Sequence, residues 1–98
     1  MKSKENLEQI LKKYKQYLRL EKSLSSNTVQ AYLNDVNKLF QYLEGKNVHP
    51  YDVTLEHLEN FSANLHDLGI QARSQARILS GIRSFYHHLV MDDYIQTD

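Results

Sequence analysis

The stretch Arg73–Leu89, RSQARILSGIRSFYHHL, decides the fold that we expect for this chain. Its apolar residues recur every three or four positions, which is the spacing of one face of an α-helix. On a helical wheel the core face collects Ile78, Leu79, Ile82, Phe85, Tyr86 and Leu89. The opposite face collects Arg73, Arg77, Ser80, Ser84, His87 and His88, with Gly81 and Arg83 at its flanks. The stretch therefore predicts an amphipathic helix whose polar face has no acidic side chain.

Three earlier segments repeat the same apolar spacing. The sequence as a whole predicts helices over about residues 5–22, 26–44, 55–68 and 73–91. Only three glycines and one proline interrupt the chain, which favours a few long helices over many short strands. Each helix has a single apolar stripe, so the stripes can be buried only by packing together. We therefore expect residues 1–98 to form one all-α domain, a compact four-helix bundle.

The predicted helix ends carry recognisable signals. Ser25 and Thr54 are candidate N-caps of the second and third helices, because a hydroxyl oxygen can accept from a backbone N–H in the first turn. Gly45 and Gly69 stand where these two helices should stop. We expect both glycines to be C-caps that adopt a left-handed backbone.

Composition excludes several classes of function. The chain has no cysteine, and no apolar stretch approaches the roughly 20 residues that span a bilayer. His57 and His66 are nine positions apart and cannot bind one metal from a single helix face. No nucleophile–base pairing or glycine-rich phosphate loop is visible. We expect a cytoplasmic protein with no catalytic residue, metal, cofactor or small-molecule substrate of its own, and no membrane contact.

Charge is distributed unevenly although the formal net charge is zero. Residues 1–22 contain seven basic and three acidic side chains, whereas residues 44–68 contain five acidic and one basic. Residues 69–91 contain three arginines and no acid. An anionic partner would therefore meet the first and fourth helices.

The polar face of the fourth helix suits a nucleic-acid backbone. Arginine donates charge-assisted bonds to phosphate oxygens, serine donates a short bond, and Gly81 would let the helix approach closely. The alternative is an exposed face that lacks acids by chance.

The second helix has a comparable polar face, made of Asn27, Ala31, Asn34, Lys38 and Gln41. Its amides could contact bases or phosphates, and the N–H groups at Ser25–Thr28 could bind one phosphate. The alternative is a capping sequence followed by solvated amides.

Two segments in order resemble a known family. They are YKQYLRLEKSLSSNTVQAYLNDVNKLFQYLE and SQARILSGIRSFYHHLV. They resemble the N-terminal core-binding domain of tyrosine recombinases, the phage-integrase and XerC/XerD-like group. The pattern consists of Ser25-x-Asn27-Thr28, Tyr32 and Asp35, then Arg77-x-Leu79-Ser80-x-Ile82-Arg83-x-Phe85-Tyr86-x-x-Leu89. The resemblance extends over about residues 7–95.

The resemblance implies a SAM-like bundle that forms one half of a C-shaped clamp around duplex DNA. Helices similar to the second and fourth would face the major groove and its phosphates. A C-terminal domain that is absent from this chain would carry out the chemistry of recombination and integration. Implied partners are double-stranded DNA and further copies of the parent recombinase in a synapse assembled on DNA.

The helical faces and the resemblance together predict the DNA contacts. The predicted residues are Ser26, Asn27, Thr28, Lys38, Ser74, Gln75, Arg77, Ser80 and Arg83. Arg73 and Lys46 are weaker candidates. The competing hypothesis is a helical protein-interaction module that does not bind DNA, and it predicts an exposed apolar patch.

Overall fold

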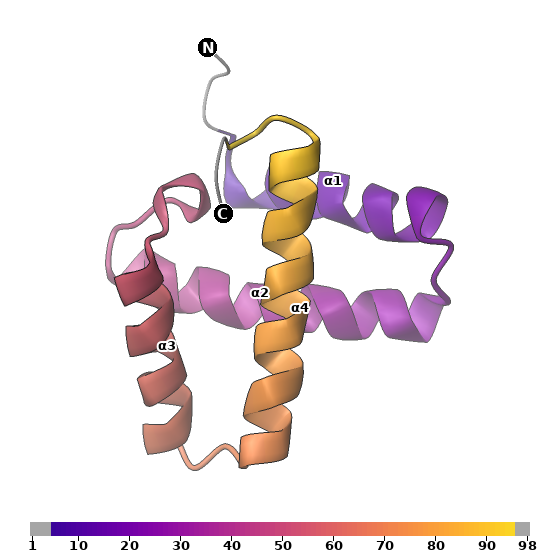
Figure 1. The fold of residues 1–98 in the computed structure, drawn as a ribbon. Helices are drawn as coiled ribbons and strands as arrows, with labels where there is room; N and C mark the ends of the chain where they lie inside the picture. Colours follow the sequence, from indigo (N-terminus) through magenta and orange to yellow (C-terminus); the bar gives the residue numbers. More distant parts are fainter. Residues whose placement is uncertain (1–4, 96–98) are drawn as a thin grey trace.

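The computed structural model describes residues 5–95, and they form four α-helices and two short helical turns (Figure 1). The elements are α1 (Leu7–Gln16), the π-helical turn η1 (Tyr17–Glu21), α2 (Ser26–Gly45), the 3-10 turn η2 (Pro50–Asp52), α3 (Leu55–Asp67) and α4 (Ala72–Met91). No β-strand occurs in this described part of the chain. The predicted all-α, four-helix fold is confirmed. The first four and last three residues of the predicted domain lie outside the described residues.

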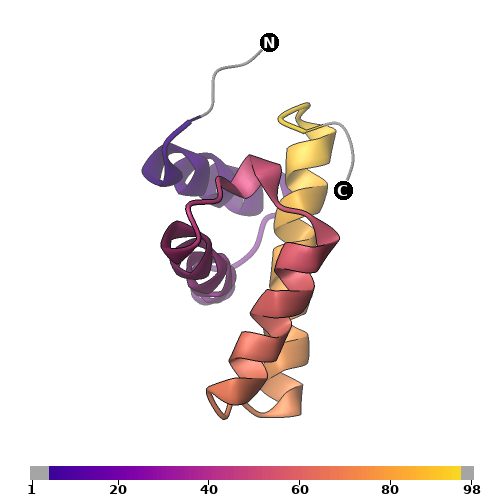
Figure 2. The ribbon, with the colours of Figure 1, turned by 90° about the vertical axis from the view of Figure 1, so that its left-hand side faces the viewer.

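The helices are arranged as two crossed pairs. α1 and α2 lie side by side in one layer, while α3 and α4 form a second pair that crosses them (Figures 1 and 2). The most extensive contact between two helices joins α2 and α4. The relative orientation of the two layers therefore depends mainly on what lies between these two helices.

Aromatic side chains fill the centre of the bundle. The ring of Phe85 on α4 is fully buried, and its centroid lies 5.1 Å from that of Tyr14 on α1 and 5.5 Å from that of Phe40 on α2. Both contacts are edge-on, the geometry that aromatic pairs favour. On the core face predicted for α4, Leu79 is half-buried. The other five residues, Ile78, Ile82, Phe85, Tyr86 and Leu89, are buried.

The N-caps are confirmed at both predicted serine and threonine positions. The hydroxyl oxygen of Ser25 accepts from the backbone N–H of Thr28 at the start of α2. The Thr54 hydroxyl oxygen accepts from the N–H of His57, and His57 Nδ1 accepts in return from the N–H of Thr54. His57 is thus part of a reciprocal cap at the start of α3.

The C-cap prediction is confirmed at Gly69 and wrong at Gly45. Gly69 follows α3 with φ of +83°, in the left-handed region. Gly45 is the last residue of α2, and Asn47 instead has the left-handed backbone, with φ of +57°. The N–H of Val48 then donates to the carbonyl of Leu43, which closes the helix end. Asparagine tolerates this conformation, so the turn does not need glycine at position 45.

His88 is also placed differently from the prediction. It is only 2% exposed, because α1 and η1 cover the side of α4 on which it lies. Its ring centroid lies 4.5 Å from that of Tyr17 and 5.5 Å from that of Tyr14. Nδ1 of His88 lies 3.2 Å from Oδ2 of Asp92, but it makes no hydrogen bond within the described residues. Burial lowers the pKa of His88, and the nearby carboxylates of Asp92 and Glu21 oppose this shift without cancelling it.

The same cover accounts for Ser84, another residue predicted on the polar face. Ser84 is half-buried, and its hydroxyl oxygen accepts a hydrogen bond of 3.2 Å from the hydroxyl of Tyr14. Tyr14 is fully buried, and loss of contact with water raises its pKa to about 12. This flank of α4 therefore belongs to the core.

Alanine substitutions at Gly69 and Gly45, the two glycines at helix ends, should change the stability of the fold in opposite directions. We expect Gly69→Ala to lower the free energy of unfolding by about 1 kcal/mol, because alanine is strained in the left-handed region. Gly45→Ala should raise it by up to about 1 kcal/mol, because position 45 is helical and open to an added methyl group. Urea denaturation of both variants tests the pair, and a loss of stability in Gly45→Ala would contradict the assignment.

His88 should make the fold sensitive to mild acid. Its pKa is lower in the folded protein than the usual 6.5, so the unfolded chain binds the proton first as the pH falls. The contribution of His88 to the free energy of unfolding is therefore fully present above pH 6.5. It is lost as the pH falls from that value to the lower pKa of His88 in the folded protein.

We expect the free energy of unfolding to fall more steeply with decreasing pH in the wild type than in His88→Phe. Urea denaturation at about pH 7.5 and about pH 5.5 measures this difference. His87→Gln is the matched control, since His87 is the exposed neighbour and its replacement should leave the pH dependence unchanged. Identical pH dependence in the wild type and His88→Phe would contradict the role given to the buried ring.

Candidate nucleic-acid interface

The outer face of α4 is basic and free of acidic side chains. Arg73, Arg77, Ser80, Arg83 and His87 are exposed along it, and no acidic residue occurs anywhere in the helix. The small residues Ala72 and Ala76 lie on the same exposed face. Three arginines are therefore presented to solvent without a carboxylate on their own helix to compete for them.

The outer face of α2 is mostly uncharged. Its exposed residues from the first turn to position 41 are Ser26, Asn27, Gln30, Asn34, Asn37, Lys38 and Gln41. Nε2 of Gln30 donates to Oδ1 of Asn34 at 3.0 Å, so two of these amides are bonded to each other. The only acidic side chain between residues 26 and 43 is Asp35, which is buried. Neither helix therefore presents an acidic side chain here to repel a polyanion.

An ion pair joins α2 to α4 where the two helices cross. Nη1 of Arg77 lies 2.8 Å from both carboxylate oxygens of Asp35. The Asp35 side chain is only 3% exposed, whereas that of Arg77 is 55% exposed. A buried carboxylate is costly unless it is paired, so Arg77 compensates the burial of Asp35 from the edge of the core.

Gly81 serves this contact between the helices. It was expected to let α4 approach a nucleic acid closely, and that prediction is wrong because Gly81 is buried. A Cβ at this position would lie 3.0 Å from Oδ2 and 3.3 Å from Cβ of Asp35. The missing side chain provides the space that the Asp35 carboxylate occupies.

Several predicted contact residues have structural partners. Ser74 and Gln75 are half-buried, and Nε2 of Gln75 donates to the carbonyl oxygen of Ile70 at 2.7 Å, which stabilises the α3–α4 connection. Thr28 is half-buried, and its hydroxyl oxygen accepts from the hydroxyl of Ser25 at 3.0 Å. Lys46 is exposed at the far end of α2, with Nζ 5.6 Å from the centre of the Tyr42 ring.

The remaining predicted residues lie on exposed surface of the two crossing helices. They are Ser26, Asn27 and Lys38 on α2, and Arg77, Ser80 and Arg83 on α4, with the weaker candidate Arg73. Sequence reasoning missed Asp35 as part of this site. Its signal is a carboxylate next to the apolar stripe that includes Val36 and Leu39, where an acidic residue needs a partner.

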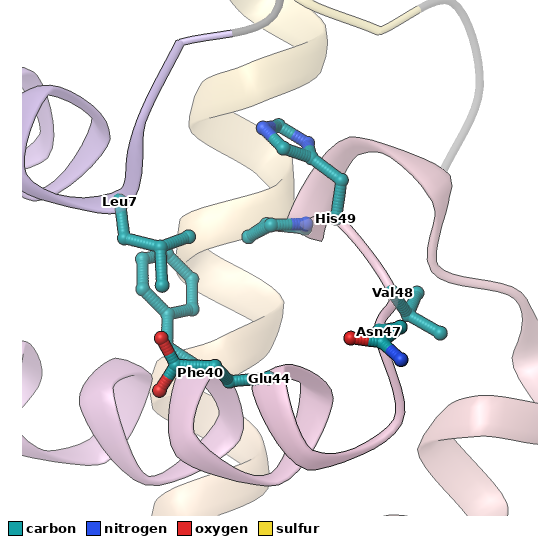
Figure 3. Close-up of a pocket in the computed structure, with 7 residues that line it drawn as sticks. Leu7, Phe40, Glu44, Asn47, Val48 and His49 are labelled. Atoms are coloured by element: carbon teal, nitrogen blue, oxygen red, sulfur yellow. The ribbon is translucent and has the colours of Figure 1, made fainter.

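A hollow of about 320 Å³ lies between the start of α1, the end of α2 and η2 (Figure 3). Its two polar groups with acid–base chemistry are Glu44 and His49, and they come from different segments (Figure 3). His49 has a structural role: its Nε2 bonds to the carbonyl oxygen of Glu5 at 2.8 Å, and its Nδ1 accepts from the N–H of Tyr51 at 3.0 Å. Leu7, Phe40, Val48 and Pro50 add apolar side chains. The hollow brings together no nucleophile and base.

Two further kinds of site are not found in residues 5–95. No group of three or more histidine, cysteine, aspartate or glutamate side chains is placed to hold a metal ion there. No helix over the same residues is long and apolar enough to span a bilayer. The basic outer face of α4, together with the adjoining face of α2, is therefore the candidate functional site.

Comparison with known proteins assigns the chain to a family. The family model described as phage integrase, N-terminal SAM-like domain, matches residues 11–92. The chain belongs to this family. The resemblance drawn from the two sequence segments is confirmed, and it covers all of α2, α3 and α4 in this SAM-like domain.

Curated relatives of this SAM-like domain are named as tyrosine recombinases. It is 36% identical over 93 residues to the tyrosine recombinase XerC of Pseudomonas syringae pv. tomato, and 34% identical to the tyrosine recombinase XerD of Staphylococcus saprophyticus. Each match covers 94% of this chain but only 31% and 32% of those relatives. The chain thus spans about a third of their length. No solved structure matches it.

Alanine substitutions of Arg77 and Arg83 on α4 should differ in their effects on the stability of the fold. Arg77→Ala leaves the buried Asp35 carboxylate without its ion-pair partner, and we expect a loss of about 2 kcal/mol in the free energy of unfolding. Arg83→Ala is the matched control, since Arg83 is exposed on the same helix and should change stability by less than about 0.5 kcal/mol. Urea denaturation compares them, and equal effects would contradict a structural role for Arg77.

Proposed function

We propose that this SAM-like domain binds duplex DNA with the outer faces of α2 and α4, as the N-terminal arm of a site-specific tyrosine recombinase. The observation that carries the proposal is the acid-free outer face of α4, with Arg73, Arg77 and Arg83 exposed along one helix. Solvated helix faces usually mix both signs of charge, whereas a face that meets phosphates gains from cations alone.

Each class of exposed side chain has a partner on the DNA backbone. Arginine and lysine donate charge-assisted bonds to phosphate oxygens, and the Ser80 hydroxyl can donate a shorter one. Asn27 and Asn34 on α2 can bond either to phosphates or to base edges. Ser26, Thr28, Ser74 and Gln75 stay predicted contacts, with roles secondary to the arginines because three of them are half-buried.

The domain should bind DNA weakly and with strong dependence on salt. Its formal net charge is zero, so long-range attraction to DNA is limited to the basic faces. With about five phosphate contacts, affinity should fall roughly 500-fold between 50 and 200 mM salt, because each contact releases condensed counterions.

Other parts of the parent protein complete the proposed activity. The relatives named XerC and XerD are recombinases about three times the length of this chain. We infer that the catalytic groups for DNA recombination and integration lie in a separate C-terminal domain, and that this chain is not itself the enzyme. Two weak DNA-binding domains joined in one chain bind much more tightly than either alone. Assembly with further copies on DNA, and a cytoplasmic location, belong to the same proposal.

The competing protein-interaction module receives less support. It predicts a contiguous apolar patch, but the large exposed apolar residues are dispersed over the described residues. They are Leu20 in η1, Leu55 and Leu68 at or just beyond opposite ends of α3, and Met91 at the end of α4. Isolated apolar residues of this kind are normal on soluble domains.

Charge reversal on α4 tests the proposed DNA-binding face. We expect the double variant Arg73→Glu, Arg83→Glu to bind a mixed-sequence 30-bp duplex more than about tenfold more weakly at low salt, since it replaces two phosphate contacts with repulsion. Fluorescence anisotropy with labelled duplex measures this loss.

The matched control is Lys12→Glu, Lys15→Glu, which makes the same change in net charge on the exposed face of α1. Its loss of affinity should be clearly smaller than that of the α4 variant. Equal losses would show that only net charge matters. A larger loss in the α1 variant would place the DNA on another face.

A further inference from the structure

We propose that Asp35 positions Arg77 for DNA, by binding one end of the guanidinium group so that the opposite edge points to a phosphate. This inference rests on the proposed DNA-binding function and assigns a role to a buried acidic residue that does not itself touch the ligand. Asp35 is a positioning residue, and Arg77 is the group that makes the contact.

The hydrogen bonds of Arg77 use only part of its guanidinium group. Both bonds to Asp35, each 2.8 Å long, come from Nη1. A guanidinium group has five N–H donors in a fixed plane, and the edge formed by Nε and Nη2 carries two nearly parallel ones. Within the described residues that edge makes no hydrogen bond, and the Arg77 side chain is 55% exposed. Such an edge matches two oxygens of one phosphate.

The Asp35 carboxylate is well suited to hold Arg77. It is buried at the crossing of α2 and α4, with 3% of its side chain exposed. On the α4 side it lies against Gly81, where an added Cβ would come within 3.0 Å of Oδ2. The carboxylate therefore has little room to turn away, and the guanidinium group bound to it is fixed in turn.

Positioning of this kind strengthens binding because it reduces the side-chain entropy that an arginine loses when it binds a phosphate. A solvent-exposed arginine has many rotamers, and most of them are lost when it binds a phosphate. Arg77 has already lost part of that freedom in the ion pair. By contrast, Arg73 and Arg83 make no ion pair within residues 5–95 and are exposed on the same face.

The proposal predicts that removing Asp35 changes the affinity for DNA in the direction opposite to that expected from charge alone. Removing a negative charge close to a DNA-binding face should strengthen binding, because Asp35 repels phosphate. If Asp35 instead orients Arg77, its removal should weaken binding although the net charge becomes more favourable. A merely structural role for Asp35 would lower stability without changing the affinity of the folded domain.

The experiment measures binding of the whole 98-residue chain to a labelled mixed-sequence 30-bp duplex at one low salt concentration. Asp35→Ala removes both acceptors, and we expect about fivefold weaker binding, in the range that the ordering of one rotamer-rich side chain costs. Asp35→Asn keeps one neutral acceptor and should lose less affinity for DNA than Asp35→Ala. Unchanged or tighter binding by folded Asp35→Ala overturns the proposal.

Arg77→Lys keeps the experiment decisive if Asp35→Ala does not fold. Lysine retains the charge and can pair with Asp35, but it has no second edge of parallel N–H groups. We expect about threefold to fivefold weaker binding with little change in the melting temperature. Affinity equal to that of the wild type would overturn the proposal, because the exposed edge of Arg77 would then have no function.

Arg83→Ala separates failure of this inference from failure of the proposed function. If it weakens binding while Asp35→Ala and Arg77→Lys do not, the DNA-binding face stands and the positioning role is wrong. If the wild-type chain does not bind the duplex at all, both proposals are overturned.

Discussion

The ion pair between Asp35 and Arg77 is the constraint on which the arrangement of the helices depends. It joins α2 to α4 at the most extensive helix–helix contact of the structure, with one nitrogen 2.8 Å from both carboxylate oxygens. A buried carboxylate cannot be left unpaired without a large cost, so the crossing is favoured only where Arg77 can reach it. Gly81 supplies the matching space on α4. One interaction thus links the packing of the core to the orientation of the basic surface.

One side of α4 packs in the core and the other is exposed to solvent. The buried side is wider than the helical wheel indicates, because it includes polar residues that the wheel places on the exposed side. One flank is covered by α1 and η1, which bury His88 and half-bury Ser84 beneath the tyrosine rings. The other flank meets α2 through Arg77 and Gly81. The outward surface that remains carries arginine, serine and histidine. The acidic side chains Glu56 and Glu59 are exposed on α3, a different helix, so the net neutral chain keeps one strongly basic face.

Much of the fold could be predicted from local sequence, whereas the ion pair between Asp35 and Arg77 in the candidate site could not. Apolar spacing locates the helices, and hydroxyl groups at Ser25 and Thr54 locate two helix starts, because each signal acts within a few residues. The Asp35–Arg77 pair joins residues 42 positions apart, and no local pattern specifies which arginine reaches the carboxylate. The burial of His88 likewise depends on where α1 packs. Gly45 failed as a C-cap because Asn47, two residues later, supplies the left-handed turn equally well.

We propose that the exposed outer faces of α2 and α4 together bind duplex DNA. Backbone amide chemical shifts, followed by NMR while a mixed-sequence duplex is added at low salt, test it most directly. We expect the largest changes along the outer face of α4 from Arg73 to Arg83 and in the first turn of α2 around Asn27, with smaller changes in α3. Changes confined to α1 and α3, with α2 and α4 unaffected, would contradict this account of the protein.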